Sequence, residues 1–250
     1  AIEILKTKLP DLLSGIKWKK SMKWSYHNLY WGRPLKSILA VFDGKTITFD
    51  FYHLKSSNFT YVDKDYELKK KSFNKFSSYI SYFKGLGIIV DQKVRQKKIE
   101  TELLKIAKKK NYSLYINFKL LEEVSNIVEK PKVILCQFDK KFLQIPKEVI
   151  VTTIEKHQKF FPAYDKDSNL INSFFIVADS EDQKGLIKKG NENVVEARLT
   201  DAEYFWKNNK SQSMLKQVSK LENVSYFEGL GNYLNNCLLY TSPSPRDRSL

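Results

Sequence analysis

The run from Leu170 to Ala178 constrains the fold most strongly, because most of its residues are apolar and they do not alternate with polar ones. Such a run is typical of a strand that is mostly buried. Asp165 to Ser168 forms a turn signal before it, and Phe160 to Tyr164 is a second extended segment ahead of that turn. The sequence therefore predicts a hairpin whose second strand lies in a core.

The remaining elements follow from hydrophobic periodicity and from glycine and proline positions. Strands are expected at 35–42, 45–52, 88–90 and 132–138, and helices at 1–13, 72–83, 91–110, 120–127, 147–157, 182–189, 191–207 and 214–221. Segment 35–42 also fits a helical stripe, so both alternatives stay open. Asp43-Gly44 favours a tight hairpin after it. Gly85 and Gly87 indicate a helix end far better than a phosphate-binding loop.

This order of elements predicts an α+β fold. Residues 1–180 are expected to form a mixed α/β region with an antiparallel or mixed sheet, and residues 181–236 to begin an all-helical domain. The tail at 237–250 is rich in proline and arginine, unlike the rest of the chain, and resembles translated sequencing adapter. We interpret it as non-native, so the true sequence after about Asn236 stays unknown.

The helix expected at 91–110 has two chemically different sides, with Asp91 as its N-cap. The apolar side is expected to hold Val94, Ile99, Leu103, Ile106 and Ala107. The other side is expected to hold Lys93, Arg95, Lys97, Lys98, Lys105, Lys108, Lys109 and Lys110. This basic side is either a solvated face or a ridge that contacts RNA.

The formal net charge of +15 also points toward nucleic acid, because lysines that neutralise phosphates release counterions. Only five of the 43 basic residues are arginines, however. A lysine bias of this kind also arises from compositional drift on solvated faces. Residues 16–31 interleave lysines with tryptophans and tyrosines. They could cradle a nucleic-acid strand, or the rings could be half-buried beneath lysine stems.

The block His157 to Pro162 combines an imidazole, an amide, a cation and two aromatic rings. His157 is a candidate for acid–base work, since an imidazole can gain or lose a proton near neutral pH. Spacing along the chain supplies it with neither a nucleophile nor an orienting partner. The alternatives are a site that contacts tRNA or another subunit and a structural histidine that forms hydrogen bonds.

Four further polar candidates share one expected helix: Asn191, Glu192, Arg198 and Asp201. Asn191 is expected to cap its start, and Arg198 and Asp201 are close enough in sequence to pair. An arginine in a lysine-biased chain indicates that the planar guanidinium group is needed. Its partner would be a phosphate or, as we prefer, a buried carboxylate. The same two alternatives apply to Arg33.

Cysteine and histidine usage predicts no metal site and no disulfide framework. Cys136 is expected to be a small buried hydrophobe, and His27 and His53 look isolated. No apolar run is long enough to cross a bilayer, so a cytoplasmic protein is expected.

Several blocks, taken in order, resemble the β subunit of the bacterial heterotetrameric glycyl-tRNA synthetase. They are Met22-Lys23-Trp24, Trp31-Gly32-Arg33-Pro34, Leu120-Leu121-Glu122-Glu123-Val124, Phe138-Asp139 with Phe142-Leu143, His157-Gln158-Lys159-Phe160-Phe161-Pro162, Gly190-Asn191-Glu192 with Val194-Val195, Ala197-Arg198-Leu199 with Asp201-Ala202-Glu203-Tyr204-Phe205, and Leu230-Gly231. These blocks cover nearly all of the chain before the non-native tail. They correspond to only an interior part of the family's longer subunit. Two departures are Asn58 to Asp63, where the family's Gly-His-Arg-Phe is missing, and Lys130, where a tryptophan is usual.

The resemblance implies a glycine–tRNA ligase in which the α subunit forms glycyl-adenylate from glycine and ATP with Mg²⁺. The β subunit contributes tRNA binding and tetramer assembly, and carries an HD-like helical domain. On this basis catalytic residues are not expected here. The candidates for contact with tRNA or the α subunit are Arg33, His157, Gln158, Lys159, Asn191, Glu192, Arg198 and Asp201. The rival hypotheses are a stand-alone RNA-binding module and a hydrolase that uses His157.

Overall fold

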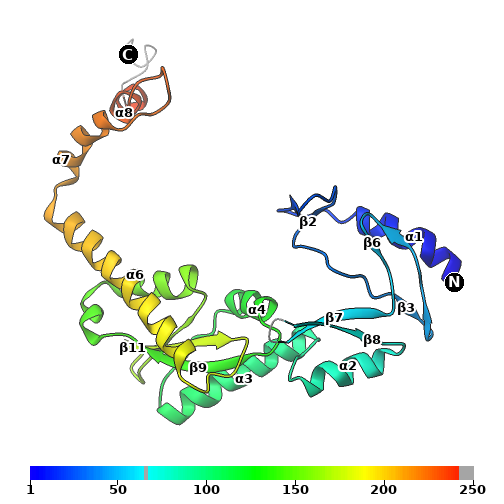
Figure 1. The fold of residues 1–250 in the computed structure, drawn as a ribbon. Helices are drawn as coiled ribbons and strands as arrows, with labels where there is room; N and C mark the ends of the chain where they lie inside the picture. Colours follow the sequence, from blue (N-terminus) through cyan, green and yellow to red (C-terminus); the bar gives the residue numbers. More distant parts are fainter. Residues whose placement is uncertain (65–66, 242–250) are drawn as a thin grey trace, which may run out of the picture. The chain divides into compact units, whose positions relative to one another are not determined.

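The computed structural model describes residues 1–64 and 67–241. Its contacts divide the chain into two compact units, Ala1–Val90 and Asp91–Leu250, and each is described by itself. Helices and antiparallel strand pairs are both present (Figure 1), which confirms the α+β class. No described helix is long and apolar enough to cross a membrane. The predicted domain boundary at residue 180 and the non-native tail stay predictions, and residues 242–250 of that tail lie outside the described residues.

The first unit consists of short hairpins between two helices. Its elements are α1 (Ile2–Ser14), β1 (Met22–Lys23), β2 (Tyr30–Trp31), β3 (Val41–Phe42), β4 (Lys45–Thr46), β5 (Asp50–Phe51), β6 (Leu54–Lys55), β7 (Phe59–Lys64), β8 (Glu67–Ser72) and α2 (Phe76–Gly85). The strands form four separate antiparallel pairs, β1 with β2, β3 with β4, β5 with β6 and β7 with β8. A small core holds Leu29, Ile47, Phe49 and Phe51, with leucines of α1 packed on it.

The hairpin at Asp43-Gly44 is confirmed: both residues have positive φ, 48° and 75°, and Val41 faces Thr46 across it. The expected strands 35–42 and 45–52 are much shorter than predicted, and 35–42 is not a helix either. The expected strand at 88–90 is wrong, because those residues have irregular backbone after the end of α2.

The second unit is built around a three-stranded antiparallel sheet in the order β10-β11-β9. Its elements are α3 (Gln92–Lys110), α4 (Phe118–Ile127), β9 (Lys132–Gln137), a 3₁₀ turn (Lys140–Gln144), α5 (Lys147–Thr152), a π-helical turn (Thr153–His157), β10 (Phe161–Tyr164), β11 (Leu170–Ala178), α6 (Leu186–Ser211), α7 (Met214–Val218), a 3₁₀ turn (Ser219–Asn223) and α8 (Tyr233–Thr241). The predicted hairpin is confirmed, with Phe161 paired to Phe175 and Tyr164 to Leu170. The predicted strand 132–138 forms the other neighbour of β11.

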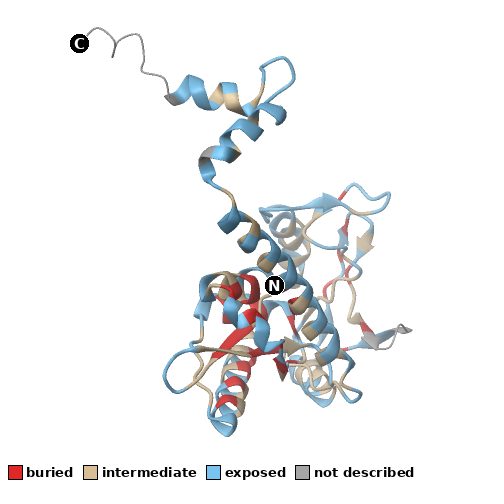
Figure 2. Ribbon diagram, turned by 90° about the vertical axis from the view of Figure 1, so that its left-hand side faces the viewer, coloured by how far each residue is buried: buried red, intermediate tan, exposed pale blue. Residues whose placement is uncertain are grey.

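Both faces of this sheet are covered. On one face Phe175 and Val133 pack with Ile99 and Leu103 of α3 and with Leu121 of α4. On the other face a second core forms, with Cys136, Phe174 and Ile176 of the sheet against Ile150, Ile154, Val195 and Leu199. Figure 2 shows the buried residues, in red, gathered on these strands and on the helix faces that pack against them. The buried β11 therefore has a helix layer on each side.

Arg95 lies on the buried side of α3, not on the lysine side where the sequence had led us to expect it. Its side chain is 9% exposed, and its Nε donates a 2.6 Å hydrogen bond to the backbone oxygen of Ser125 at the end of α4. Val94, expected in the core, is instead 57% exposed. A guanidinium has enough donors to remain hydrogen-bonded when buried, so here it ties the two helices together.

The helical segment after residue 181 also differs from expectation. The helices expected at 182–189 and 191–207 form one continuous helix, α6, which runs through Gly190. Its N-cap is Gly185, and Asp182 just before it accepts hydrogen bonds from the first-turn backbone amides of Ile187 and Lys188. Asn191 is therefore inside the helix and does not cap it. Between residues 200 and 241, no side chain whose burial is described is buried.

We expect Arg95→Ala to lower the free energy of unfolding by ~1.5–3 kcal/mol, the range for hydrogen bonds that involve a charged group. Lys97→Ala, on the exposed side of the same helix, should change it by less than about 0.5 kcal/mol. Chemical denaturation of both variants measures the difference. Equal stability of the two variants would contradict the structural role of Arg95.

Candidate RNA-contact surfaces

One side of α3 carries a row of lysines, which we call the α3 lysine face. At 100° per residue its members fall within ~160° of the helix circumference, opposite the buried residues. They are Lys93, Lys97, Lys98, Lys105, Lys108 and Lys109, and all are exposed. Within the described part of the chain, no ion pair joins any of them to a carboxylate. This positive charge is therefore available to an anionic partner.

Lysines on other elements of the same unit are placed differently. Lys132 pairs with Glu181 at 3.0 Å, Lys188 lies 3.8 Å from Glu192, and Lys207 pairs with Glu203. The pairing with Glu181 raises the pKa of Lys132. These cations already have local partners. Other lysines of the unit, such as Lys119 and Lys189, have no ion pair within the described residues either. What distinguishes the α3 lysine face is therefore that six such lysines share one side of a single helix.

A shallow cavity of about 390 Å³ continues this face at the C-terminal end of α3. Lys108 and Lys166 line it together with Asn111 and Tyr112. Lysines near a helix C-terminus also complement the helix dipole, so Lys108 and Lys109 have a local role as well. The cavity extends the basic surface from α3 to the turn between β10 and β11.

In the aromatic and basic segment 16–31, part of the aromatic side chains pack within the protein and part remain exposed. Trp18 lies edge-on to Trp31 with ring centroids 4.9 Å apart, and Trp24 Nε1 donates to the Trp31 backbone oxygen at 3.0 Å. A Cβ on Gly32 would lie 2.8 Å from the Trp18 ring, which explains the glycine beside Trp31. Tyr26, by contrast, is 99% exposed. The tryptophans therefore take part in packing, although Trp18 is still 42% exposed, and Tyr26 and Tyr30 are open to a ligand.

His157 ends the π-helical turn, and its side chain is exposed. No hydrogen bond to it is found among the described residues, so the structural interpretation of a hydrogen-bonded histidine is wrong here. Within the part of the chain that the structure describes, no nucleophile or orienting carboxylate is hydrogen-bonded to its imidazole either. Gln158 and Lys159 beside it are half-buried, while Phe161 and Pro162 enter the core through β10. The block is thus a surface feature anchored by buried rings.

Lys159 adopts a left-handed backbone with φ of 61°. This conformation terminates the π-helical turn, because the amide of Phe160 then donates to the Ile154 oxygen at 3.0 Å. Its Nζ donates to Glu123 of α4 at 2.9 Å, across a partly exposed surface. Exposed ion pairs of this kind contribute little, ~0–1 kcal/mol. The backbone role of this residue is the larger one.

The candidates on α6 have mixed roles. Glu192 accepts a 2.8 Å hydrogen bond from the backbone amide of Gln137, at the end of the edge strand β9. Glu196, which the sequence did not single out, does the same for the amide of Asp139 at 3.1 Å. Asn191 donates its side-chain amide to the Ile187 oxygen within the helix. Glu192 and Glu196 thus attach α6 to the sheet, so Glu192 has a structural use.

Arg198, Asp201 and Arg33 are exposed. The preferred interpretation of Arg198 as half of a buried pair is therefore wrong, and within the described residues no ion pair joins it to Asp201. The proposed contact roles of all three stay predictions. The exposed guanidinium groups of Arg33 and Arg198 are compatible with an external anionic ligand, whereas the carboxylate of Asp201 would repel one.

Sequence reasoning also missed several contacts made by carboxylates. Asp179 accepts hydrogen bonds from the amides of Glu129 and Lys130, both at 2.7 Å. Asp165 organises the β10–β11 turn, and hydrogen bonds from the Asn169 backbone and side chain lower its pKa. An acidic residue just before or after an element boundary is the signal that could have found them.

The histidines expected to be isolated are not. His27 and His53 stack with ring centroids 3.6 Å apart beside a cavity of about 190 Å³. Among the described residues no group of three or more His, Cys, Asp or Glu side chains is placed to hold a metal ion. Cys136 is fully buried, and burial raises the pKa of its thiol to about 12, so it is unreactive.

We expect Lys159→Gly to change the free energy of unfolding by less than about 1 kcal/mol, because relief of the left-handed backbone offsets the removal of the ion pair. Lys156→Gly, at an exposed helical position nearby, should destabilise by about 1 kcal/mol. Thermal or urea denaturation of the two variants tests this. A loss for Lys159→Gly larger than that for Lys156→Gly would show that its side chain, not its backbone, matters.

Comparisons with known proteins agree with the motifs. The family model for the glycyl-tRNA synthetase beta subunit matches residues 1–238. The chain is 32% identical over 252 aligned residues to the glycine–tRNA ligase beta subunit of Rickettsia akari, covering 98% of this chain and 38% of that protein. It is 35% identical over 231 residues to the beta subunit of Dictyoglomus turgidum, covering 92% of this chain and 34% of that protein. The chain thus spans little more than a third of these relatives, and it belongs to the glycyl-tRNA synthetase beta subunit family.

Proposed function

We propose that this chain is a segment of a β subunit that supports ATP-dependent attachment of glycine to its tRNA. It does so by binding tRNA and by assembling with a catalytic α subunit in an α₂β₂ complex in the cytoplasm. Membership of the family supports the reaction class. The observation that carries tRNA binding is the α3 lysine face, whose six lysines have no carboxylate partner within the described residues.

A row of lysines on one helix side suits a phosphate backbone. Lysine acts toward phosphate as a point charge and needs no fixed fork geometry, so the spacing of the cations matters more than their orientation. Each neutralised phosphate releases counterions, which drives binding and makes it sensitive to salt. The interaction would be independent of sequence, and recognition of the particular tRNA would lie elsewhere in the complex.

The proposal assigns the chemistry to the α subunit. In the described part of this chain, His157 is exposed and has no hydrogen-bonded partner to hold its imidazole for proton transfer. ATP and Mg²⁺ would accordingly bind to the α subunit as substrate and cofactor of the whole complex. The role of this chain is then to position tRNA for a reaction on another polypeptide.

Reconstitution tests the proposal as a whole. The full-length gene that contains this segment is expressed with the neighbouring α-subunit gene, and charging of tRNA with glycine is measured with and without the β chain. We expect charging to require both chains. Charging that persists without the β chain would contradict the proposal. RNA binding with no effect on charging would favour a stand-alone RNA-binding module.

A more specific prediction for the full-length subunit concerns the α3 lysine face. Replacing Lys97, Lys98, Lys105 and Lys108 by glutamine should weaken tRNA binding and reduce the slope of log affinity against log salt, by about 1 for each phosphate that a lysine no longer neutralises. A control variant removes the same type of charge from Lys132, Lys188 and Lys207, which already have carboxylate partners. Its slope should change much less.

Fluorescence anisotropy over a range of salt concentrations measures both slopes. Unfolding curves should show that neither variant is destabilised, because all of these side chains lie at the surface. Equal slopes for the two variants would show that the α3 lysine face does not contact RNA.

A further inference from the structure

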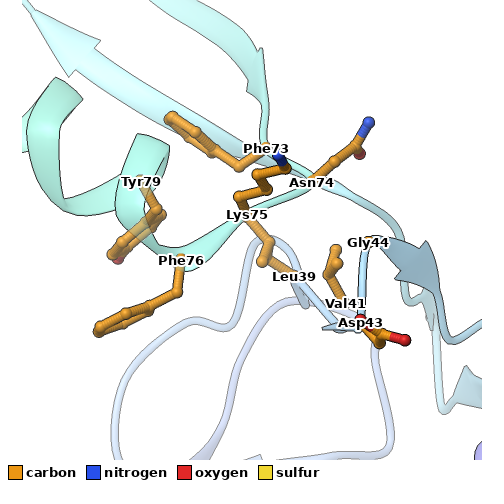
Figure 3. A pocket seen from close by; sticks show the side chains of 9 residues that line it. All are labelled: Leu39, Val41, Asp43, Gly44, Phe73, Asn74, Lys75, Phe76 and Tyr79. Atoms are coloured by element: carbon orange, nitrogen blue, oxygen red, sulfur yellow. The ribbon is translucent and has the colours of Figure 1, made fainter.

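One cavity lies in the first unit, between the β3–β4 hairpin and the start of α2. It has a volume of about 650 Å³, within the usual range of ~300–1,000 Å³ for small-ligand sites. Figure 3 shows Phe76 and Tyr79 of α2 on one side and Leu39 and Val41 on the other. Nothing in the family resemblance or in the lysine face accounts for this cavity.

Phe76 and Tyr79 form the aromatic wall of the cavity, and Phe76 is open to solvent. Phe76 is 77% exposed at the first turn of α2, although large apolar side chains normally avoid water. Its ring plane is within 16° of that of Tyr79, with centroids 6.5 Å apart. A flat ring that stacks on one of them is therefore also aligned with the other. Phe73 behind them is 5% exposed and packs edge-on to Tyr79, which holds the wall in place.

The polar groups at the rim do not enter the cavity. The carboxylate of Asp43 and the amide of Asn74 point away from the aromatic and aliphatic side chains (Figure 3). Asn74 Oδ1 is already used, because it accepts a 2.9 Å hydrogen bond from Asn58. The interior thus offers mainly apolar contact and stacking, with the Tyr79 hydroxyl as a polar group of its lining. Such a surface accepts any planar ring, since stacking does not depend on base identity.

The surroundings of the cavity are cationic. Lys75 lines it, Lys45 follows Gly44 in the adjacent hairpin, and Lys71 lies with its Nζ 5.2 Å from the centre of the Tyr82 ring of α2. No ion pair of these three lysines is found within the described residues. The first ninety residues hold sixteen lysines and arginines against seven aspartates and glutamates. A ligand that enters this cavity is therefore expected to carry negative charge outside its planar part.

We propose that the cavity binds an unstacked nucleobase of single-stranded RNA, with Phe76 and Tyr79 as the stacking wall and the lysines near the flanking phosphates. Single-stranded bases splayed onto aromatic side chains are the common mode of RNA recognition outside helices. An apolar segment of a partner protein fits less well, because lysine is depleted in the cores of protein interfaces. The inference rests on the proposed function only in taking tRNA as the RNA.

The test uses the full-length subunit with Phe76→Ala, and Phe118→Ala as the matched control. Phe118 is also an exposed phenylalanine at the start of a helix, α4, but it lies in the other unit. Phe76→Ala should weaken tRNA binding about 5- to 150-fold, the loss that corresponds to ~1–3 kcal/mol per stacked base. Phe76→Trp should restore it. Phe118→Ala should stay within about twofold of the unaltered subunit.

The salt dependence separates stacking from charge. The slope of log affinity against log salt should be the same for Phe76→Ala and the unaltered subunit, because the substitution removes no cation that neutralises a phosphate. In addition, tRNA that contains 5-iodouracil should crosslink under ultraviolet light to residues of the cavity wall, identified by mass spectrometry. Coinciding melting curves should show that Phe76→Ala is folded.

Three outcomes would overturn the inference. One is an unchanged affinity of Phe76→Ala for tRNA while the lysine variant of α3 is weakened, which leaves the proposed function intact. Another is loss of α-subunit binding with tRNA binding unchanged, which would make the cavity a protein-docking site. The last is failure of the unaltered subunit to bind either tRNA or a short mixed-sequence single-stranded RNA. Binding of that short RNA alone, weakened by Phe76→Ala, would support the cavity and contradict the proposed function.

Discussion

The second unit depends on β11, a strand that is buried on both faces. Ser173, Phe174, Phe175 and Ile176 are all at most 2% exposed, and they alternate between the two cores. Fully burying each large apolar side chain contributes ~1.5–3 kcal/mol. This strand can be stable only if helices cover both sides, so it requires α3 and α4 on one face and α5 and α6 on the other. The basic surface is a consequence, because the outer side of α3 is left to solvent.

Carboxylates provide the second recurring interaction. Asp179, Asp182, Glu192 and Glu196 each accept hydrogen bonds from backbone amides at the ends of strands or helices. Such charge-assisted bonds are stronger than neutral ones. Several acidic side chains of the second unit are therefore already hydrogen-bonded to backbone amides or paired with lysines outside α3. The lysines of α3 remain without carboxylate partners in the described chain, so a positive face persists although the unit contains many acids.

Much of this architecture could be predicted from the sequence. The hairpin before and through β11, the long helix α3 with its Asp91 cap, and the turn at Asp43-Gly44 all follow from local patterns. The short strands of the first unit could not be predicted well, because pairs of two residues leave almost no periodic signal. The candidate site was less predictable still. Its polar residues meet partners far away in sequence, as Glu192 meets Gln137. Within α3, residue type gave the wrong side for two residues. At 100° per residue Val94 falls in the middle of the α3 lysine face, and Arg95 falls beside Ile99. Their exposed fractions of 57% and 9% agree with that geometry.

The central claim is that the α3 lysine face contacts tRNA, and lysine acetylation of the full-length subunit with and without tRNA tests it most directly. Quantitative mass spectrometry reports the reactivity of each amine. The account predicts that tRNA protects Lys97, Lys98, Lys105 and Lys108, while Lys132 and Lys188, which have carboxylate partners, keep their reactivity. Protection of the second group without the first would contradict the account.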